Sequence, residues 1–337
     1  MRKYLLGKEG GFYKANLHCH TTISDGKKTP EEVKEMYKNA GYSVVAYTDH
    51  DVLVPHDELC DDSFIALNGL EVAVKPILVS PTPISSKTCH MCMIALKQDN
   101  ITQPLFNEKY VHIGKSRDYI PMVKREESDP PYEYEYSGKG ISEIMQGYRD
   151  AGFFVTYNHP TWSQESYPEY INYFGMHAME MFNGSCLMLG YDEYNHRVYD
   201  DMIKSGKHIF CIGADDNHNK PTLPDSFRAF TMINAKALTY DEITAALLRG
   251  DFYATEAPEI HELYYEDGKI HIECTPAREI TVNCLTRRCR HVWSENGEPI
   301  TSVDIDIPDD AISFRVTVTD SAGYHATTSA YFIDSLK

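Results

Sequence analysis

Short apolar segments that alternate with amphipathic helices are the feature that most constrains the fold of this chain. The predicted strands cover residues 15–20, 43–50, 64–74, 88–96, 153–160, 178–184 and 208–218. The predicted helices cover residues 29–41, 141–152, 191–206 and 239–251. In the first helix, Thr29 is placed as N-cap, Pro30 lies in the first turn, and Gly41 stops the helix. This alternation predicts parallel βαβ units, and the number of strands predicts a barrel.

Potential metal ligands lie at the ends of these predicted strands or just after them. They are His18, His20, Asp25, His50, Glu71, His90, His159, Asp216 and His218. The strand period of two puts His18 and His20 on one face, and Asp216 and His218 repeat that spacing. Side chains at strand ends converge at one rim of a barrel, which can build a metal site from distant residues. Separate, hydrogen-bonded histidines in the core or on the surface are the alternative.

The order of the motifs resembles that of the PHP (polymerase and histidinol phosphatase) family of metal-dependent phosphoesterases. The series HxH, a downstream Asp, TDH, GxE, a strand His, NHP and DxH runs over about residues 13–255. The resemblance implies a distorted seven-stranded (β/α) barrel with a trinuclear metal centre. The implied ligand sets are His18, His20, Glu71 and Asp216; Glu71 as a bridge with His90 and His159; and Asp25, His50 and His218. The residues implied in catalysis are Glu71, His159 and Asp216.

Residues 97–138 interrupt the alternation with a polar, Pro- and Tyr-rich insertion. Long irregular insertions in compact domains are usually binding loops or lids, and a solvated loop is the alternative. Because the insertion follows the strand that contains His90, we expect it to leave from the rim of the active site and to face that site.

From about Ala257-Pro258 onward, helical patterns give way to short alternating strands separated by turn signals. These strands cover residues 269–276, 279–285, 311–320 and 327–334. They predict a small immunoglobulin-like β-sandwich that contributes no catalytic group. The predicted domains are therefore a PHP-type barrel over residues 1–257, including the insertion, and a β-sandwich over residues 258–337. This layout resembles the carbaryl-hydrolase-like branch of the PHP family, which includes ester and carbamate hydrolases.

Composition limits the partners of the chain. The net charge of −18 argues against an extended nucleic-acid footprint and against attraction to anionic membranes. The first 18 residues have too short an apolar run for a signal peptide or a membrane span. The nine irregularly placed cysteines indicate reduced, buried thiols in a cytoplasmic protein. The oligomeric state is left open.

Charge also favours a phosphate substrate. Three divalent cations facing three carboxylates and neutral imidazoles would leave a charge of about +3, which a hydroxide and a phosphate dianion would neutralise. We therefore expect hydrolysis of a small, anionic phosphate ester by a metal-activated hydroxide. The nitrogen and oxygen donors suit two or three Zn, Mn or Fe ions. Hydrolysis of a non-phosphate ester, carbamate or amide, and a non-catalytic metal-binding module, are the alternatives.

Some further polar residues are candidates for contact with the substrate. Cationic side chains near the predicted site could bind phosphate, and amide side chains at strand ends could orient it. The candidates are Asn183, Lys115, Arg117, Lys220 and Arg228. Glu180 lies on the same predicted strand as Asn183 and could also touch the substrate. Asp49 is expected either to orient the imidazole of His50 or to make a simple hydrogen bond at a strand end.

Overall fold

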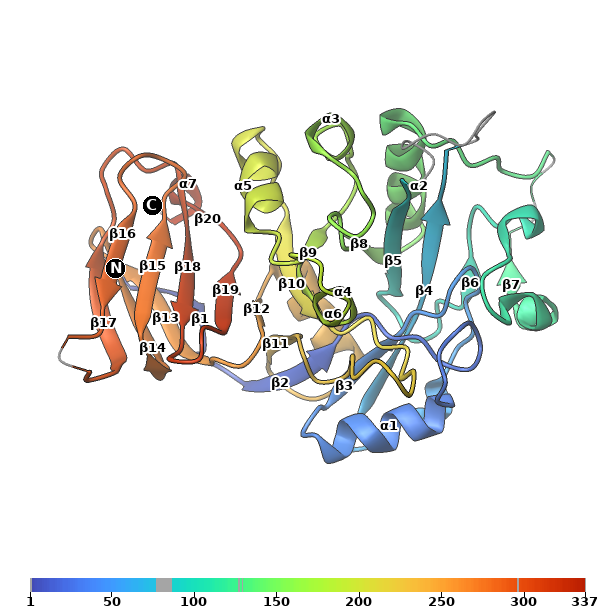
Figure 1. Cartoon of the computed structure of the whole chain (residues 1–337), viewed down its shortest axis with the longest axis horizontal. Coiled ribbons are helices and arrows are strands. Elements are labelled where there is room, and N and C mark those ends of the chain that lie inside the picture. The colour runs from blue at the N-terminus through green and yellow to red at the C-terminus, as the bar shows by residue number, and fades with distance from the viewer. Residues whose placement is uncertain (1, 77–86, 127, 129, 296, 337) are drawn as a thin grey trace.

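The computed structural model describes residues 2–76, 87–126, 128, 130–295 and 297–336. One half of the molecule is a mixed α/β barrel, and the other half is a separate antiparallel β-sandwich (Figure 1). The barrel strands are β2 (Gly11–Asn16), β3 (Val44–Tyr47), β4 (Ile65–Val74), β5 (Cys89–Ala95), β8 (Phe153–Tyr157), β9 (Ala178–Asn183) and β10 (Phe210–Ala214). The α-helices are α1 (Pro30–Asn39), α2 (Gly138–Asp150), α3 (Tyr167–Tyr170), α4 (Gly184–Met188), α5 (His196–Lys204), α6 (Tyr240–Arg249) and α7 (Ile333–Leu336).

The remaining strands connect the barrel to the sandwich or build the sandwich itself. They are β1 (Lys3–Leu6), β11 (Phe230–Ala235), β12 (Phe252–Thr255), β13 (Ile260–Glu266), β14 (Lys269–Ala277), β15 (Glu279–Asn283), β16 (Arg290–Trp293), β17 (Ile300–Asp306), β18 (Ser313–Thr319), β19 (His325–Thr328) and β20 (Tyr331–Phe332). The insertion contains the short strands β6 (Thr102–Gln103) and β7 (Lys124–Arg125). 3₁₀ helices cover Asp57–Leu59, Glu108–Tyr110 and Ser116–Met122.

Helix α1 begins and ends as the sequence predicts. The Thr29 hydroxyl accepts a hydrogen bond from the Glu32 amide, and the Glu32 carboxylate accepts one from the Thr29 amide, which forms a capping box. Gly41, with φ of 82°, follows the last turn. The predicted helix at residues 191–206 was too long, because α5 begins only at His196.

The barrel closes through strands that lie far apart in the sequence. Within the described residues seven strands form the ring, in the order β2, β3, β4, β5, β8, β9 and β10. A parallel bridge between Cys19 and Asn217, just beyond the ends of β2 and β10, joins the last strand to the first. This closure brings the ends of β2, β4, β8 and β10 to one rim.

Strand β5 corrects the expectation of parallel strands throughout. It pairs antiparallel with both β4 and β8, whereas the pairs β2–β3, β3–β4, β8–β9 and β9–β10 are parallel. Parallel neighbours need a crossover, usually a helix, and the sequence of residues 75–88 has three prolines and no helical period. His90 therefore lies at the start of its strand, and this start is at the same rim as the ends of the parallel strands.

The direction of β5 also changes where the insertion starts. The strand ends at the opposite rim, where the Leu96 amide donates to the carbonyl of Gly152, just before β8. The expectation that residues 97–138 leave from the rim of the site was therefore wrong. The insertion instead returns along the barrel, and the Gln103 side chain bonds the Leu53 amide and the Asp51 carbonyl at the site rim.

Two facing sheets form the sandwich. One has the order β1-β13-β14-β17, and the strands β19, β18, β15 and β16 face it. Buried side chains such as Ile272 of β14 and Val316 of β18 pack in the same core cluster. The sandwich includes β1, from the start of the chain, and β12 pairs with β19, so that the barrel sheet continues into the sandwich. The predicted boundary at residues 257 and 258 remains a prediction.

Two further observations concern the state of the cysteines and the length of the helices. All nine cysteines are free, and Cys289 is exposed while the others are buried or half-buried. No helix among the described residues is long and apolar enough to cross a membrane.

A buried ion pair links the sandwich to the barrel. Arg315 of β18 binds Asp200 of α5 through two hydrogen bonds, of 2.8 and 3.0 Å, and Asn283 of β15 donates a third, of 2.7 Å. Both charged side chains are at least nine-tenths buried. Removing one partner would leave the other charge buried without compensation.

We therefore expect Arg315→Ala to lower the free energy of unfolding by roughly 3–5 kcal/mol, measured by urea denaturation. Arg249→Ala is the matched control, because Arg249 pairs with Asp251 at the surface and should cost no more than about 1 kcal/mol. Equal losses for the two variants would show that the buried pair does not hold the two halves together.

Candidate metal centre

All nine predicted metal ligands lie together at the rim where the parallel barrel strands end. Their donor atoms form overlapping groups, and within each group the atoms lie within 4.8 Å of one another. The groups are His20, Asp25, His50 and His218; His18, His159 and Asp216; His50, Glu71 and His90; and His18, Glu71 and Cys92. Because His50, Glu71 and His18 each belong to two of these groups and link all four, the groups form one continuous cluster that could hold more than one metal ion. The role of each residue as a ligand remains a prediction.

The first implied ligand set has the spacing that a single divalent ion requires. His18 Nε2 and His20 Nε2 are 3.0 Å apart, and Asp216 Oδ1 lies 3.3 and 3.0 Å from them. Glu71 Oε1 lies 3.2 Å from His18 Nε2. Bonds of about 2.0–2.2 Å in a tetrahedral site separate ligand atoms by about 3.3 Å. These four side chains therefore fit around one ion.

The Glu71 carboxylate lies at the centre of the cluster. Its Oε1 is 3.1 Å from His90 Nδ1 and 3.3 Å from His159 Nε2, and its Oε2 is 3.0 Å from His50 Nδ1. Its two oxygens thus face different imidazoles, as the oxygens of a bridging carboxylate do. The grouping differs in part from the implied sets, because His50 approaches Glu71 as well as Asp25.

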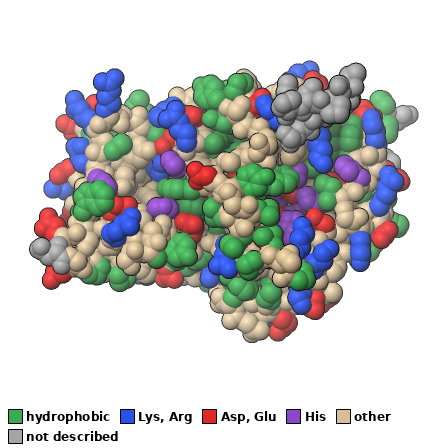
Figure 2. All heavy atoms as spheres, viewed as in Figure 1, with side chains coloured by type: hydrophobic (Ala, Val, Ile, Leu, Met, Phe, Trp, Pro, Cys, Tyr) green, Lys and Arg blue, Asp and Glu red, His purple; other side chains and the backbone are tan. Residues whose placement is uncertain are grey.

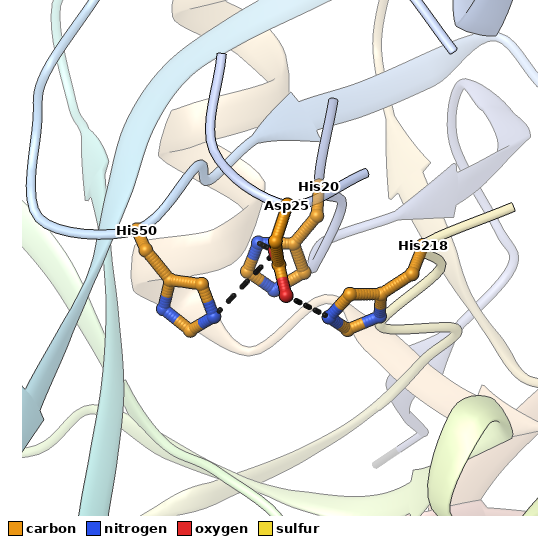
Figure 3. Close-up of side chains that lie close together, drawn as sticks. All are labelled: His20, Asp25, His50 and His218. Carbon is orange, nitrogen blue, oxygen red and sulfur yellow. Dashed lines mark ion pairs between the residues drawn. The ribbon is translucent and has the colours of Figure 1, made fainter. Parts of the chain in front are cut away.

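The third implied set surrounds Asp25, in the loop that follows β2. Figure 3 shows the side chains of His20, His50 and His218 pointing toward this carboxylate. The Asp25 oxygens lie 3.3 Å from His218 Nε2, 3.8 Å from His20 Nδ1 and 3.9 Å from His50 Nε2. His20 stacks between the rings of His50 and His218, at centroid distances of 4.3 and 4.5 Å. Asp25 and His218 are half-buried, whereas Glu71 is buried. This group therefore lies nearer to solvent than Glu71 does.

Unpaired polar atoms support the fit of a metal ion to these residues. Among the described side chains, the buried atom His90 Nε2 has no hydrogen-bond partner, while His50 Nδ1 and Glu71 Oε2 lie 3.0 Å apart and form no hydrogen bond with each other or with another group. A buried polar atom without a partner costs free energy, and metal coordination is one of the ways in which such an atom is satisfied. The donor set, of imidazole nitrogens and carboxylate oxygens, is one that Zn, Mn and Fe accept.

Mutual electrostatics keep the carboxylates of the cluster ionised. Burial raises the pKa of Glu71, but His90, His18 and His50 outweigh burial and hold that pKa well below its usual range. Burial lowers the pKa values of His50 and His159, yet the facing carboxylates raise both to about 9. For His90 burial prevails, and its pKa falls to about 4.

A fully buried carboxylate, Glu180 of β9, orients two of the predicted ligands. Its Oε1 lies 2.7 Å from His18 Nδ1, and its Oε2 accepts hydrogen bonds of 2.8 Å from the His159 amide and from Asn183 Nδ2. A carboxylate behind a ligating histidine fixes the tautomer of the ring and raises its basicity. Glu180 thus supports the cluster from behind, and does not line the cavity.

Two further buried aspartates hold the loops that carry the ligands. Asp49 accepts hydrogen bonds from the amides of Thr21 and Ser24 and from both of their hydroxyls, which fixes the loop between His20 and Asp25. It does not orient His50, as one of the two sequence interpretations proposed. Asp215 accepts bonds from the Tyr37 hydroxyl and from the amides of residues 227–229, which anchors the segment after His218.

The backbone at the rim adopts conformations that L-residues rarely take. His159 has φ of 26°, Asp216 has φ of 53°, and Asp51, next to His50, has φ of 69°. Such residues cost about 1–3 kcal/mol each and persist where the surroundings hold them, commonly at functional sites. The strain at this rim coincides with the predicted ligands.

A cavity of about 470 Å³ opens directly onto the cluster. Figure 2 shows histidine side chains beside hydrophobic and basic ones in the barrel half of the molecule. The cavity is lined by seven of the predicted ligands together with Lys75, Ile113, Trp162, Ser185, Cys186, Leu189, Lys220, Thr222 and Leu223. The insertion faces the site through Ile113, and among the described residues no side chain of the sandwich lines the cavity.

The candidate substrate contacts fall into two classes. Lys220 lines the cavity, whereas Lys115, Arg117 and Arg228 are exposed elsewhere and do not line it. Asn183 is fully buried, donates to Glu180 and Asp216, and caps α4, so its amide supports the cluster. The role of all these residues in binding remains a prediction.

Sequence analysis missed several residues of the site. Lys75 directly follows β4, and Trp162 follows the NHP motif by two residues, so their positions at strand ends were the available signals. Cys92 faces Glu71 across the β4–β5 ladder, and burial raises the pKa of its thiol to about 11. Asn158 donates to Glu71 Oε1 and to Cys92 Sγ, both at 3.1 Å.

Comparison with known proteins gives distant likenesses to solved structures. No protein-family model and no curated protein matches the chain. A two-domain protein from Bacteroides vulgatus, containing a predicted PHP-like metal-dependent phosphoesterase, is similar at 14% identity and a TM-score of 0.47, over 98% of this chain and 99% of its own. A protein from Bifidobacterium adolescentis, whose name proposes a metal-dependent phosphoesterase, is similar at 17% identity and a TM-score of 0.39, over 64% and 91%. An amidohydrolase from Chromobacterium violaceum with bound sulfate and no metal is similar at 15% identity and a TM-score of 0.35, over 60% and 87%.

The contacts of Glu180 predict a loss of metal affinity without a loss of fold. In Glu180→Gln the amide NH₂ must face either His18 Nδ1 or the His159 amide, so that one ligand loses its acceptor. We expect the affinity for Zn²⁺ to fall by roughly 10–100-fold, measured by competition with a chelator. Glu165→Gln is the control, since it changes a buried carboxylate that contacts no predicted ligand. Equal affinity in the Glu180 variant and the wild type would contradict the positioning role.

Glu165 itself predicts a pH dependence of stability. The hydroxyls of Tyr136, Tyr157 and Tyr173 donate to its carboxylate. Burial raises the pKa of Glu165 to about 7, against the lowering effect of these bonds. The folded state thus holds this proton to higher pH than the unfolded state, so the contribution of Glu165 to stability is greatest below about pH 4.3 and is lost as pH rises through about 7.

Glu165→Gln should remove that part of the pH dependence. We subtract the unfolding free energy of the wild type from that of the variant. We expect this difference to increase by at most about 3 kcal/mol from pH 4.5 to pH 8. Urea denaturation at several pH values, with chelator present throughout, measures the difference. A constant difference over this range would show that Glu165 titrates alike in both states.

Proposed function

We propose that this chain is a metal-dependent hydrolase that cleaves a small phosphate ester at a di- or trinuclear centre. The observation that carries the proposal is the convergence of six histidines and three carboxylates into one cluster, in which the two oxygens of Glu71 face different imidazoles. The order of the motifs, which resembles that of PHP phosphoesterases, supports the same reaction. The ions best suited to these donors are Zn, Mn or Fe.

The cavity favours a catalytic centre over a structural one. Structural metal sites are closed, whereas catalytic sites keep a position open for water or substrate. Here a cavity of about 470 Å³ opens onto His50, Glu71 and Asp216, within the range of volumes of small-molecule sites. This geometry counts against the non-catalytic metal-binding module.

The residues of the chain have distinct roles in the proposed reaction. Bound divalent ions would polarise the phosphoryl oxygens and lower the pKa of a bound water. Glu71, His159 and Asp216 would hold these ions, and Glu180 and Asn158 would fix the orientation of the holding side chains. Lys220, at the mouth, would attract an anionic substrate. Glu71 on β4 and His90 on β5 are buried, so the barrel wall would limit the access of water to them from outside the cavity.

Hydrolysis of a carboxyl ester, carbamate or amide is the second candidate, since the same donors could activate water for it. A phosphate dianion neutralises a centre with excess positive charge, and a neutral amide does not. Activity on p-nitrophenyl phosphate and p-nitrophenyl acetate separates the two candidates. Faster turnover of the acetate by the metal-loaded protein would favour the second.

The position of Glu71 predicts how metal content and turnover depend on it. We expect the wild type to bind two or three ions per chain by elemental analysis after supplementation. Glu71→Gln should lose at least one ion and lower kcat by about 10³-fold or more, because one substitution removes charge from two ion positions. Glu256→Gln, a half-buried residue outside the cluster, is the control and should keep both properties. Fewer than about one ion per wild-type chain would refute a multinuclear centre.

A further inference from the structure

Part of the lining of the cavity at the cluster is apolar. Trp162, Ile113 and Leu223 are half-buried in it, Cys186 is buried, and Leu189 is 53% exposed at its edge. These residues come from four separate segments: the loop after β8, the insertion, α4 with its end, and the loop after His218. A hydrolytic site for small polar phosphates has no use for such a surface, since apolar side chains at the mouth favour apolar ligand groups.

Trp162 is the largest of these apolar side chains, and it lies beside the cluster. Its ring is edge-on to His159 at 4.9 Å and to His90 at 5.3 Å between centroids. The buried Glu193 carboxylate accepts hydrogen bonds from the amides of Thr161 (3.2 Å) and Trp162 (3.0 Å) and fixes the backbone there. The indole is therefore held beside two predicted ligands, within reach of a group attached to a metal-bound phosphate.

Ile113 is held just as firmly, although it lies in the insertion. The Asp51 carboxylate accepts hydrogen bonds from the amides of His112 (3.0 Å) and Ile113 (3.2 Å), and the Ser24 carbonyl accepts one from Lys115 (2.8 Å). Between them Gly114 has φ of 60°, and a Cβ there would collide with the Ser24 carbonyl. The insertion thus presents an apolar side chain to the cavity, while its cations remain outside.

Two lysines flank the cavity. Lys75 and Lys220 are both exposed and line it, and in the part of the chain that the structure describes neither forms an ion pair. Other lysines of the acidic chain do pair with a carboxylate, as Lys34 does with Asp61. Unpaired ammonium groups beside a metal cluster suit a phosphate dianion.

From this arrangement, and resting on the proposed function, we infer the class of substrate: a phosphate monoester whose leaving group carries an apolar body of ring size. The phosphate would lie at the cluster between Lys75 and Lys220, and the apolar body would lie against Trp162 and Ile113. The water oxygen bonds to phosphorus, and the ester P–O bond breaks with its electron pair on the leaving oxygen. That oxygen takes a proton derived from the water, so the products are an alcohol or phenol and inorganic phosphate.

Binding of phosphonates, which cannot be hydrolysed at phosphorus–carbon bonds by this reaction, tests the inference apart from turnover. The chain has two tryptophans, so Trp293→Phe leaves Trp162 as the reporter of fluorescence. We expect metal-loaded Trp293→Phe to bind phenylphosphonate at least about tenfold more tightly than methylphosphonate, with a change in Trp162 emission. Equal affinities, or tighter binding of phenylphosphonate without a change in emission, would overturn the inference.

Kinetics of a Trp162 variant give the second test. Trp162→Ala should raise KM for 1-naphthyl phosphate by at least about tenfold and leave KM for ethyl phosphate within about twofold. Trp162→Phe should recover most of the loss, and Trp293→Ala, exposed on the sandwich, is the matched control. Metal content should be equal in all variants. Equal increases in KM for both substrates would overturn the inference.

The two tests separate this inference from the proposed function. A metal-loaded wild type that hydrolyses neither phosphate would refute the phosphoesterase, and the phosphonate titration would still decide whether the cavity selects an apolar group. Hydrolysis of ethyl phosphate and 1-naphthyl phosphate with equal kcat/KM would refute the substrate class and leave the phosphoesterase standing.

Discussion

The concentration of ionisable side chains around Glu71 is the constraint on which the rest of the structure depends. Burying a carboxylate without compensation costs several kcal/mol, and here three carboxylates are gathered in one place. The facing imidazoles offset that cost, as the depressed pKa of Glu71 shows. The closed ring of strands brings Glu71, His159 and Asp216 together from distant parts of the chain.

A layer of buried carboxylates then holds the ligands in position. Asp49, Glu180 and Asp215 accept hydrogen bonds mostly from backbone amides and hydroxyls of the loops that carry ligands. Asp49 and Glu180 thereby fix the backbone at or next to predicted ligands, and Asp215 anchors residues 227–229, after the last of them. The strained backbone of His159 is held in this way, because its amide donates to Glu180. The positions of the predicted ligands are therefore fixed by side chains that do not line the cavity.

The residues of the cluster could be predicted from the sequence more completely than the residues around it, and the reasons are physical. His18 and His20 could be placed together because a strand repeats every two residues, and the capping box of α1 is a local pattern. The direction of β5 could not be predicted from its residues, since a buried strand has the same apolar sequence in either direction. Only the sequence of residues 75–88, which has three prolines and no helical period, was informative. Trp162 and Ile113 follow no period, and their place depends on how Glu193 and Asp51 bind the backbone of distant loops.

The first strand of the chain has a consequence for how the protein is made. Strand β1 lies at the edge of the sandwich and pairs with β13, so residues 3–6 leave the ribosome long before their partner does. Until then their backbone amides and carbonyls are an open edge, which is prone to pair with other chains. The barrel can assemble while synthesis continues, but the sandwich must wait until the strands up to β19 have been made. A cut between the halves would therefore separate β1 from its sheet, and neither fragment would correspond to a whole unit of the fold.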